Sequence, residues 1–240
     1  MTDVLTVAAA SMRDDVLRVR VLSHNLANVQ TPGYRKQIAV GAGFAHHFAH
    51  ADSAHSPAPV RRDAVVIDPR AGTLKSTGIG ADVAVEGAAF IEVAGPSGPL
   101  YTRQGSLHVD VQGRLVGEHG FPVNGAGGEI RLANLPFTIG RDGAVRQQDR
   151  VIGHIKLVSF VDAGQLTPHG QGLYLQDRAR IDEHALASQL RSGYLESSNV
   201  NVTEEMVRLT EAVRHFESIH RVVQTHDEMM EKAIRKLGEF

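Results

Sequence analysis

The stretch Ser23-His24-Asn25-Leu26-Ala27-Asn28-Val29-Gln30-Thr31-Pro32-Gly33-Tyr34 marks the point at which the sequence changes its pattern. Upstream of it, apolar residues recur at helical spacing, which predicts one amphipathic helix from about residue 2 to residue 29. Proline disfavours helical backbone in the residue before it, and a Pro-Gly pair suits the central positions of a type II turn. We therefore expect the helix to end before Pro32 and Gly33 to adopt a positive φ angle. The apolar residues of this helix are Leu5, Met12, Val16, Val19, Leu22, Leu26 and Val29.

A second helical pattern occupies the other end of the chain. Asn201 suits the N-cap of this helix, Glu204 suits a capping box, and Gly238 suits the helix end. Both terminal patterns form narrow apolar stripes of the a/d type, which are unstable without a partner. We expect residues 1–34 and 196–240 to pack together as a coiled coil, or else against a neighbouring subunit. The apolar residues of the second stripe are Met206, Leu209, Val213, Phe216, Val223, Met230, Ile234 and Leu237.

The middle of the chain follows other patterns. Residues 35–69 have weak periodicity and predict a loosely structured connector. Over residues 70–195 the period is near two, with hairpin signals at Asn124-Gly125 and Asp142-Gly143 and a long strand predicted from Val151 to Phe160. These strands do not alternate with helices, which disfavours a Rossmann-type sheet. The sequence therefore predicts an α+β protein whose central domain is an antiparallel β sandwich or partial barrel.

Composition excludes several classes of protein. The formal net charge of the 240 residues is -2, so no global basic field favours nucleic acid. The chain has no cysteine, which excludes disulfides and thiolate metal sites. No apolar run is long enough to span a bilayer. The apolar run near the N-terminus follows Asp3 and precedes Arg13-Asp14-Asp15, unlike a secretory signal. We expect any export to occur without a cleaved signal peptide.

Candidate catalytic or metal-binding groups are weak. His46 and His50 would share one face of a helix, as two metal ligands do, but no third ligand is identifiable. Gly78-Ile79-Gly80 is too short for a dinucleotide fingerprint, and no nucleophile elbow occurs. We therefore expect no catalytic residue, no cofactor and no metal. Spacing also selects no pair among the acidic residues that could act together, Asp68, Asp82, Asp110 and Glu118.

Three groups of motifs resemble the bacterial flagellar rod and hook proteins. The first is the stretch from Ser23 to Tyr34, which resembles the N-terminal signature of that family. The second lies in the centre and includes Val85-Glu86-Gly87-Ala88-Ala89-Phe90-Ile91-Glu92-Val93 and Asp110-Val111-Gln112-Gly113-Arg114-Leu115-Val116. The third is Leu195-Glu196-Ser197-Ser198-Asn199-Val200-Asn201, followed by Glu204-Glu205-Met206-Val207. The motifs occur in the order found in the family and cover both termini and most of the centre.

This resemblance implies a structural subunit of the flagellar basal-body rod and not an enzyme. Its partners would be other rod proteins, copies of itself and the flagellar type III export apparatus, without nucleic acid or membrane insertion. The terminal helices would line the inner tube of a helical assembly that transmits torque, and the β domain would face outward. The expected location is the periplasmic rod of the basal body. Within the family, chain length favours a proximal rod protein first and the distal rod protein second.

The expected assembly interface combines both terminal helices and the turn. His220 and Asp227 fall at seam positions, where a polar residue can fix the register of a coiled coil. The alternative structural interpretation is that the two apolar stripes are ordinary core faces of a helical domain. The alternative function is a metal-binding or enzymatic β domain with helical oligomerisation arms, which bound metal in the purified protein would favour. The predicted interface residues are Leu22, Leu26, Asn28, Gly33, Met206, Leu209, Val213, Phe216, Val223 and Met230.

Overall fold

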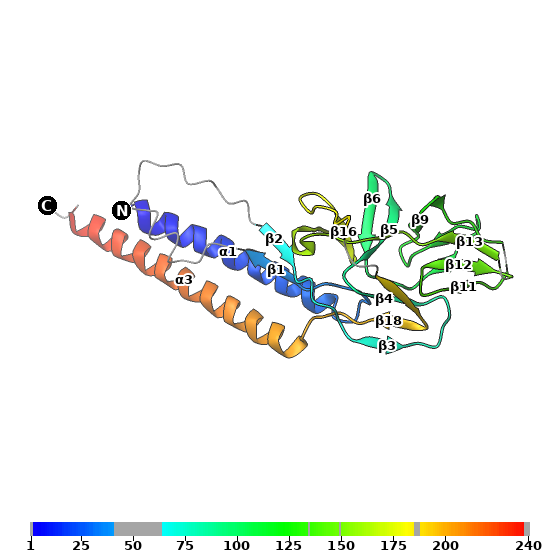
Figure 1. Cartoon of the computed structure of the whole chain (residues 1–240). Helices are drawn as coiled ribbons and strands as arrows, with labels where there is room; N and C mark the ends of the chain where they lie inside the picture. The colour runs from blue at the N-terminus through cyan, green and yellow to red at the C-terminus, as the bar shows by residue number, and fades with distance from the viewer. Residues whose placement is uncertain (1, 41–63, 134, 149, 185–187, 238–240) are drawn as a thin grey trace. The chain divides into compact units, whose positions relative to one another are not determined.

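The computed structural model describes residues 2–40, 64–133, 135–148, 150–184 and 188–237. The chain forms two compact units. We call Met1–Leu26, Ile38–Val65 and Asn201–Phe240 the helical unit, and Ala27–Gln37 and Val66–Val200 the β unit. Along the sequence, the chain first passes into the β unit after residue 26 and leaves it for the last time after residue 200 (Figure 1).

Helix α1 spans Thr2–Ala27, close to the predicted range. The chain then turns as the sequence indicates, because the Tyr34 backbone nitrogen donates to the Thr31 carbonyl at 3.3 Å. Gly33 has a φ angle of +66°, which confirms the expected positive value. Glycine adopts this region without the steric penalty that a Cβ atom brings.

Helix α3 spans Val202–Leu237, and its start is also as predicted. The Asn201 side-chain oxygen accepts hydrogen bonds from the backbone nitrogens of Thr203 at 3.1 Å and Glu204 at 3.4 Å. Asn201 is therefore the N-cap, which satisfies amide groups that have no partner within the helix. The acidic side chains of Glu204 and Glu205 lie in the first turn, at the positive end of the helix dipole. None of the described helices is both long and apolar enough to cross a membrane.

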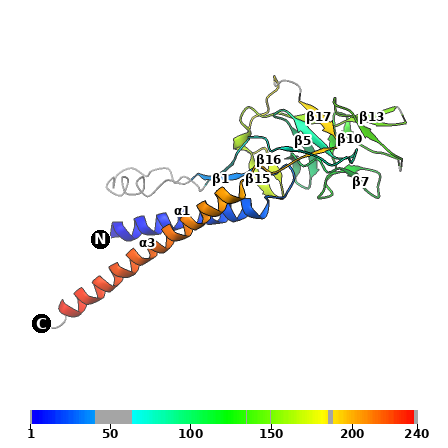
Figure 2. The same ribbon diagram turned by 90° about the horizontal axis from the view of Figure 1, so that it is seen from below.

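Within the helical unit, α1 and α3 run in opposite directions (Figure 1 and Figure 2). Side-chain hydrogen bonds between described residues join them, from Asn25 to Glu205 and between Asp15 and His215. We call the buried and partly buried line of α3 the α3 seam. Its residues recur at alternating spacings of four and three, and they are Glu205, Leu209, Ala212, Phe216, Ile219, Val223 and His226. The helical unit also contains most of a two-stranded sheet made by β1 (Gln37–Val40) and β2 (Ala64–Ile67).

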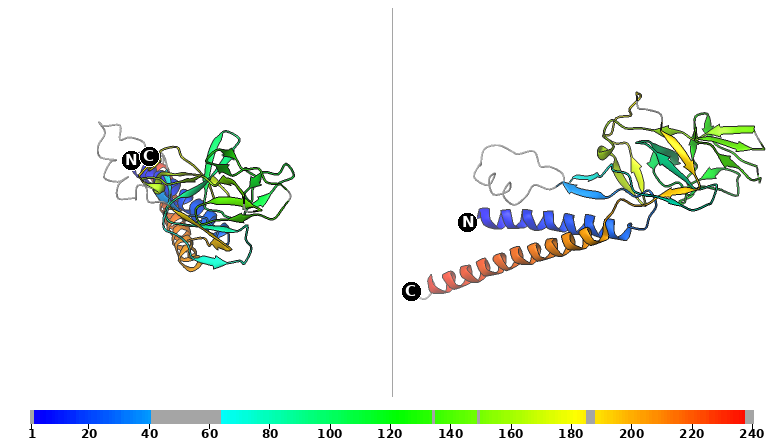
Figure 3. Two further views of the ribbon diagram at one scale, coloured as in Figure 1. Left: turned by 45° about the vertical axis from the view of Figure 1, so that its right-hand side comes forward. Right: turned by 60° about the horizontal axis from the view of Figure 1, so that its bottom comes forward.

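The β unit is built from antiparallel strand pairs, which confirms the predicted α+β class (Figure 3). The largest sheet has five strands in the order β14-β5-β6-β16-β15, which are Leu157–Val158, Phe90–Gly95, Gly98–Thr102, Leu173–Leu175 and Thr167–Gly170. A three-stranded sheet has the order β11-β12-β13, which are Thr138–Ile139, Ala144–Gln147 and Arg150–His154. A short 3-10 helix, η1, spans Ala163–Gln165.

Four further pairs complete the described strands of this unit. They are β3 with β18 (Leu74–Ser76, Tyr194–Glu196), β4 with β17 (Val83–Glu86, Gln189–Ser192), β7 with β8 (His108–Val109, Leu115–Val116) and β9 with β10 (Asn124–Gly125, Gly128–Glu129). Both β3–β18 and β4–β17 join strands from opposite ends of the unit. The late part of the chain therefore closes onto its early part.

Two strand predictions need correction. The predicted strand from Val151 to Phe160 is divided, because β13 pairs with β12 whereas β14 pairs with β5 in another sheet. Between them, the Ile155 and Lys156 nitrogens donate to the carbonyls of Gly143 and Asn124, respectively. Asn124-Gly125 is strand β9 itself and not the turn of a hairpin. Asp142-Gly143 does form the turn between β11 and β12, with Gly143 at a φ angle of +80°.

The core of the β unit consists of two apolar clusters. The larger one gathers aliphatic side chains from many strands, including the fully buried Val83, Ile91 and Leu115. The smaller one is aromatic, and the rings of Tyr101 and Phe160 meet edge to face with centroids 4.9 Å apart. Such a ring pair contributes about 0.5–1.5 kcal/mol beyond the burial of its area. This rigid core holds the polar cluster described next.

Candidate assembly surfaces and their anchor

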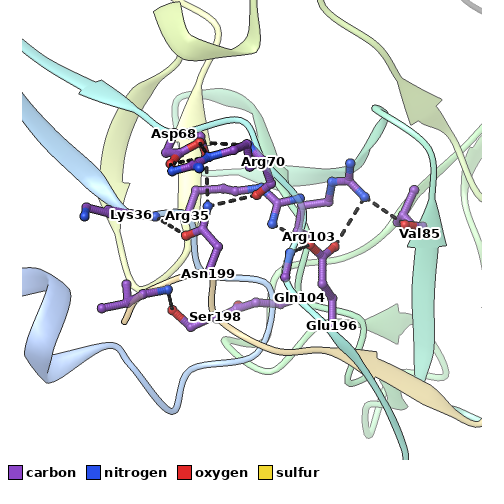
Figure 4. Close-up of polar contacts among 12 residues, drawn as sticks. Arg35, Lys36, Asp68, Arg70, Val85, Arg103, Gln104, Glu196, Ser198 and Asn199 are labelled. Carbon is purple, nitrogen blue, oxygen red and sulfur yellow. Dashed lines mark hydrogen bonds and ion pairs between the residues drawn. The ribbon is translucent and has the colours of Figure 1, made fainter. Parts of the chain in front are cut away.

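Three charged side chains form a buried ionic cluster in the β unit, and at most 2% of each is exposed. They are Arg35, Arg103 and Glu196 (Figure 4). One Glu196 carboxylate oxygen accepts from the Arg35 guanidinium and, at 2.8 Å, from the Gly72 backbone nitrogen. The other oxygen lies 3.3 Å from Arg103 Nη1. Arg35 follows α1 and Glu196 precedes α3, so this cluster holds the two segments that continue into the helices. We call the cluster of Arg35, Arg103 and Glu196 the anchor.

The second positive charge of the cluster is stabilised by backbone carbonyls. Arg103 donates to the carbonyl oxygen of Val85 at 2.8 Å and to that of Gly87, and its guanidinium lies 5.2 Å from the centroid of the Phe90 ring. Burial lowers the pKa of Arg103 to about 10, and the nearby Glu196 carboxylate opposes this shift. Arg103 therefore remains charged near neutral pH. Because a buried charge is costly without partners, loss of Glu196 would leave two guanidinium groups close together.

Tyr174 fixes the backbone at the same place. Its hydroxyl oxygen accepts from the Arg35 backbone nitrogen at 2.8 Å. Burial raises the pKa of Tyr174 to about 12, so its hydroxyl stays protonated at physiological pH. The aromatic cluster thus supports the anchor through a hydrogen bond as well as through packing.

Asn199 joins three segments of the β unit. Its side-chain oxygen accepts from the Lys36 backbone nitrogen at 2.7 Å, and its amide donates to the carbonyls of Arg70 at 2.8 Å and Asp68 at 3.2 Å (Figure 4). Asp68 in turn pairs with Arg70, and hydrogen bonding from the Arg70 side chain lowers the pKa of Asp68. Asn199 lies in a motif that carried the family resemblance, but the sequence did not indicate this role.

Gly33 is constrained by space as well as by its φ angle. Its backbone nitrogen donates to the Glu196 carbonyl at 2.7 Å. A Cβ atom on Gly33 would lie 2.4 Å from the backbone carbonyl carbon of Arg103. Asn28 stabilises the same turn, since its side-chain oxygen lies 3.2 Å from the Thr31 hydroxyl. These two predicted interface residues therefore shape the anchor at the end of α1.

The contact between α1 and α3 is polar at two points, one buried and one partly exposed through His215. Asn25 Nδ2 lies 2.7 Å from Glu205 Oε2, and His215 Nδ1 lies 2.6 Å from Asp15 Oδ2. Asn25, Glu205 and Asp15 are completely buried. Sequence analysis missed all four residues because it sought apolar seam positions. The spacing of Asp15 and Asn25 on α1 was the available signal.

The remaining predicted interface residues fall into two groups. Leu22 is buried, and Leu26, Leu209, Phe216 and Val223 are partly buried. Met206, Val213 and Met230 are exposed, and so are the polar residues His220 and Asp227. We call the exposed apolar line of α3 that recurs at multiples of seven residues the outer stripe, and its residues are Met206, Val213 and Ile234, with 40–66% of each exposed. Met230 lies instead on the line of Leu209, Phe216 and Val223.

Three of the four acidic candidates, Asp68, Asp82 and Asp110, have structural partners. Asp110 pairs with Arg114 at 2.8 Å and closes the turn between β7 and β8. The hydroxyl of Ser106 lies 3.4 Å from the Asp82 carboxylate, and Asp68 pairs with Arg70. Across the described ranges, no group of three or more His, Cys, Asp or Glu residues could hold a metal ion. His46 and His50 lie outside the described residues.

Comparison with known proteins finds two family models. Residues 191–236 match the model described as flagellar basal body rod FlgEFG protein C-terminal, and residues 84–147 match that of the flagellar hook protein FlgE/F/G D1 domain. Among similar proteins is the flagellar basal-body rod protein FlgG of Buchnera aphidicola subsp. Schizaphis graminum, which is 30% identical over 90% of this chain and 92% of its own length.

Proteins named FlgF are similarly related. The FlgF protein of Caulobacter vibrioides is 29% identical over 92% of this chain and 91% of its own length. That of Mesorhizobium japonicum is also 29% identical, over 99% of each chain. The two names occur at nearly the same identity, so the preference for a proximal over a distal rod protein stays a prediction.

Proposed function

This chain belongs to the flagellar basal-body rod protein family, and from that premise we propose that its helices carry the assembly contacts while its β unit holds the anchor. It is a structural subunit of the bacterial flagellar basal body. We propose that it assembles with other rod proteins and with copies of itself into a helical tube that transmits torque. Repeated heterologous contacts between subunits produce such open assemblies when the rotation does not close.

The outer stripe of α3 is the observation that supports this proposal most directly. Three apolar side chains lie on one line of the helix, and each is at least 40% exposed. Contiguous exposed apolar surface on a soluble protein commonly marks an interaction site. We propose that a neighbouring subunit covers the outer stripe, while the α3 seam packs on α1 as an antiparallel coiled coil. The interface would then include Met206 and Val213, whereas Met230 would extend the line of the α3 seam beyond Val223.

Further parts of the proposal concern location and export. We propose that the protein lies in the periplasmic part of the rod and reaches it through the flagellar type III pathway without a cleaved signal peptide. Proximal placement in the rod is our first choice, and distal placement is the second. The family membership is the support for these assignments.

The proposal is tested by placing one charge on the outer stripe. Val213→Glu puts a carboxylate where we expect an apolar subunit contact, so we expect loss of motility and of intact rods in a strain that lacks this protein. Ser218→Glu is the matched control, because Ser218 is exposed on the same helix, on the line that carries Glu204 and Glu211. Both variants should show the same thermal unfolding in solution. Normal rods with Val213→Glu would exclude the outer stripe as an interface.

A further inference from the structure

Both polar contacts between α1 and α3 fit the same register, that is, the same alignment of the two helices along their length. Asn25 and Asp15 lie ten residues apart on α1, and their partners Glu205 and His215 lie ten residues apart on α3. Because the helices are antiparallel, one alignment satisfies both contacts. Asp15 also pairs with Arg18 at 3.5 Å, but Arg18 moves with α1 and does not depend on the register.

Apolar packing alone selects this register only weakly. A slip of seven residues along α3 would bring Phe216 to the place of Leu209 and Met230 to the place of Val223. Both of these exchanges replace one apolar side chain by another, and volume-conserving apolar exchanges cost little. Among the apolar seam positions, only that of Ile219 would receive a polar residue, His226. The apolar residues therefore permit neighbouring registers.

The polar contacts discriminate where the apolar residues do not. After the same slip, Asn25 would lie opposite Ala212 and Asp15 opposite Val222. A slip in the other direction also separates both pairs. When a buried polar group loses its partner, the equilibrium constant for packing of the two helices falls by about tenfold or more. The two pairs act at separate points, so their effects combine.

We propose that the pairs Asn25–Glu205 and Asp15–His215 are register-determining residues of the helical unit. Polar residues at buried seam positions have this role in other coiled coils, where they lower stability but select one alignment. The register decides which residue of the α3 seam lies opposite each residue of α1. The pairs thereby specify how the two helices are aligned along their length.

Cysteine cross-linking of the full chain tests this proposal, since the protein contains no cysteine of its own. Ala8→Cys with Val223→Cys reports the native register, and Ala8→Cys with Met230→Cys reports the register slipped by seven residues. A disulfide requires Cβ atoms about 3.5–4.5 Å apart, so each reporter closes only near its own register. The extent of oxidation is measured by mass spectrometry at low protein concentration, where links between chains are excluded.

In the otherwise unchanged chain, we expect the native reporter to close at least about tenfold faster than the slipped reporter. In a second background, leucine replaces Asn25, Glu205, Asp15 and His215, and there we expect the preference to fall by at least about tenfold. A matched control replaces Glu204 and Arg208 by leucine, because this ion pair lies within α3 and carries no register information. The control should keep the native preference.

Three results would overturn the proposal. The leucine background could keep the native preference, which would assign the register to apolar packing. Both reporters could close equally in the unchanged chain, which would mean that no register is selected. Neither reporter could close in the leucine background, which would make the polar pairs necessary for pairing itself. These measurements use the isolated protein, so their outcome is independent of the proposed role of the outer stripe.

Discussion

The Asn25 amide and the Glu205 carboxylate lie 180 positions apart in the sequence, yet they meet at 2.7 Å in a place closed to solvent. This contact joins the last turns of α1 to the first turns of α3. An uncharged donor therefore faces a carboxylate where the two helices begin to pair.

Asn25→Asp should weaken this contact in a pH-dependent way. At neutral pH the change places a second carboxylate against Glu205, and we expect the free energy of unfolding of the helical unit to fall by about 1–3 kcal/mol. In mild acid one carboxyl group of the pair becomes protonated and can donate, so the loss should diminish. Thermal unfolding monitored by circular dichroism at both pH values measures this. Ser218→Asp is the control, and an equal loss at both pH values would show that repulsion is not the cause.

Gly33 should tolerate no side chain. The positive φ angle that the sequence predicts for Gly33 would by itself penalise valine more than asparagine. The approach of Arg103 corrects that ranking, because any Cβ atom meets its backbone at 2.4 Å. We expect Gly33→Ala, Gly33→Asn and Gly33→Val each to reduce the unfolding free energy of the β unit by about 2–4 kcal/mol.

The neighbouring Pro32 provides the control for this turn. Pro32→Ala removes only the restriction that proline places on the unfolded chain, so we expect a loss below about 1 kcal/mol. Chemical denaturation of all four variants gives the comparison. If Gly33→Asn resembled Pro32→Ala, the close approach to Arg103 would not limit this position.

The charge of Asp68 should stabilise the fold only at pH values above the pKa of Asp68 in the folded protein. Hydrogen bonding from Arg70 lowers the pKa of Asp68 from 3.8, so the folded state holds its proton less tightly than the unfolded state does. The contribution is therefore fully present above about pH 4–5 and is lost as the pH falls through the folded-state pKa. We expect Asp68→Asn to be less stable than the unchanged chain at pH 7 and equally stable in strong acid.

The reference for that comparison is Asp162→Asn, a change on the exposed N-cap of η1 in the same unit. Urea denaturation between pH 2 and pH 7 gives the two curves. A difference between Asp68→Asn and the unchanged chain that stayed constant over this range would mean that the charge of Asp68 has no part in its effect.

Limited proteolysis should separate the two units. We predict that residues 1–30 and 200–240 open more often than the β unit does in the free monomer, since a long helix with few buried contacts is marginally stable. Trypsin should therefore cut after Arg214 and Arg221 on α3 much earlier than after the buried Arg35 and Arg103. Mass spectrometry over time identifies the cuts. Equal rates at all four sites would contradict the prediction.

Local signals predicted the helices and turns of this protein well. Asn201 as N-cap, the bend at Thr31–Tyr34 and the positive φ angle of Gly33 each depend on a few neighbouring residues. The division of the predicted strand near Ile155 was not predictable, because it depends on which distant strands accept β13 and β14.

The seam and the anchor illustrate the same limit. Apolar residues occur on several lines of α3, so periodicity could not decide which line is buried against α1. Glu196 meets Arg35 from 161 positions away and Arg103 from 93, and nothing near these residues in the sequence specifies the pairing. The motif that contains Glu196 and Asn199 supported the family resemblance but gave no geometry.

The ionic cluster also has a consequence for the order of events during synthesis. Arg35 and Arg103 leave the ribosome long before Glu196, which carries the only carboxylate among the described residues that either guanidinium contacts. Two guanidinium groups must therefore stay hydrated until residue 196 emerges, since burying them unpaired is too costly. Strands β17 and β18, which close the early strands β4 and β3, arrive at the same late stage. The β unit of a growing chain thus cannot complete its fold until the whole segment that precedes α3 has emerged from the ribosome.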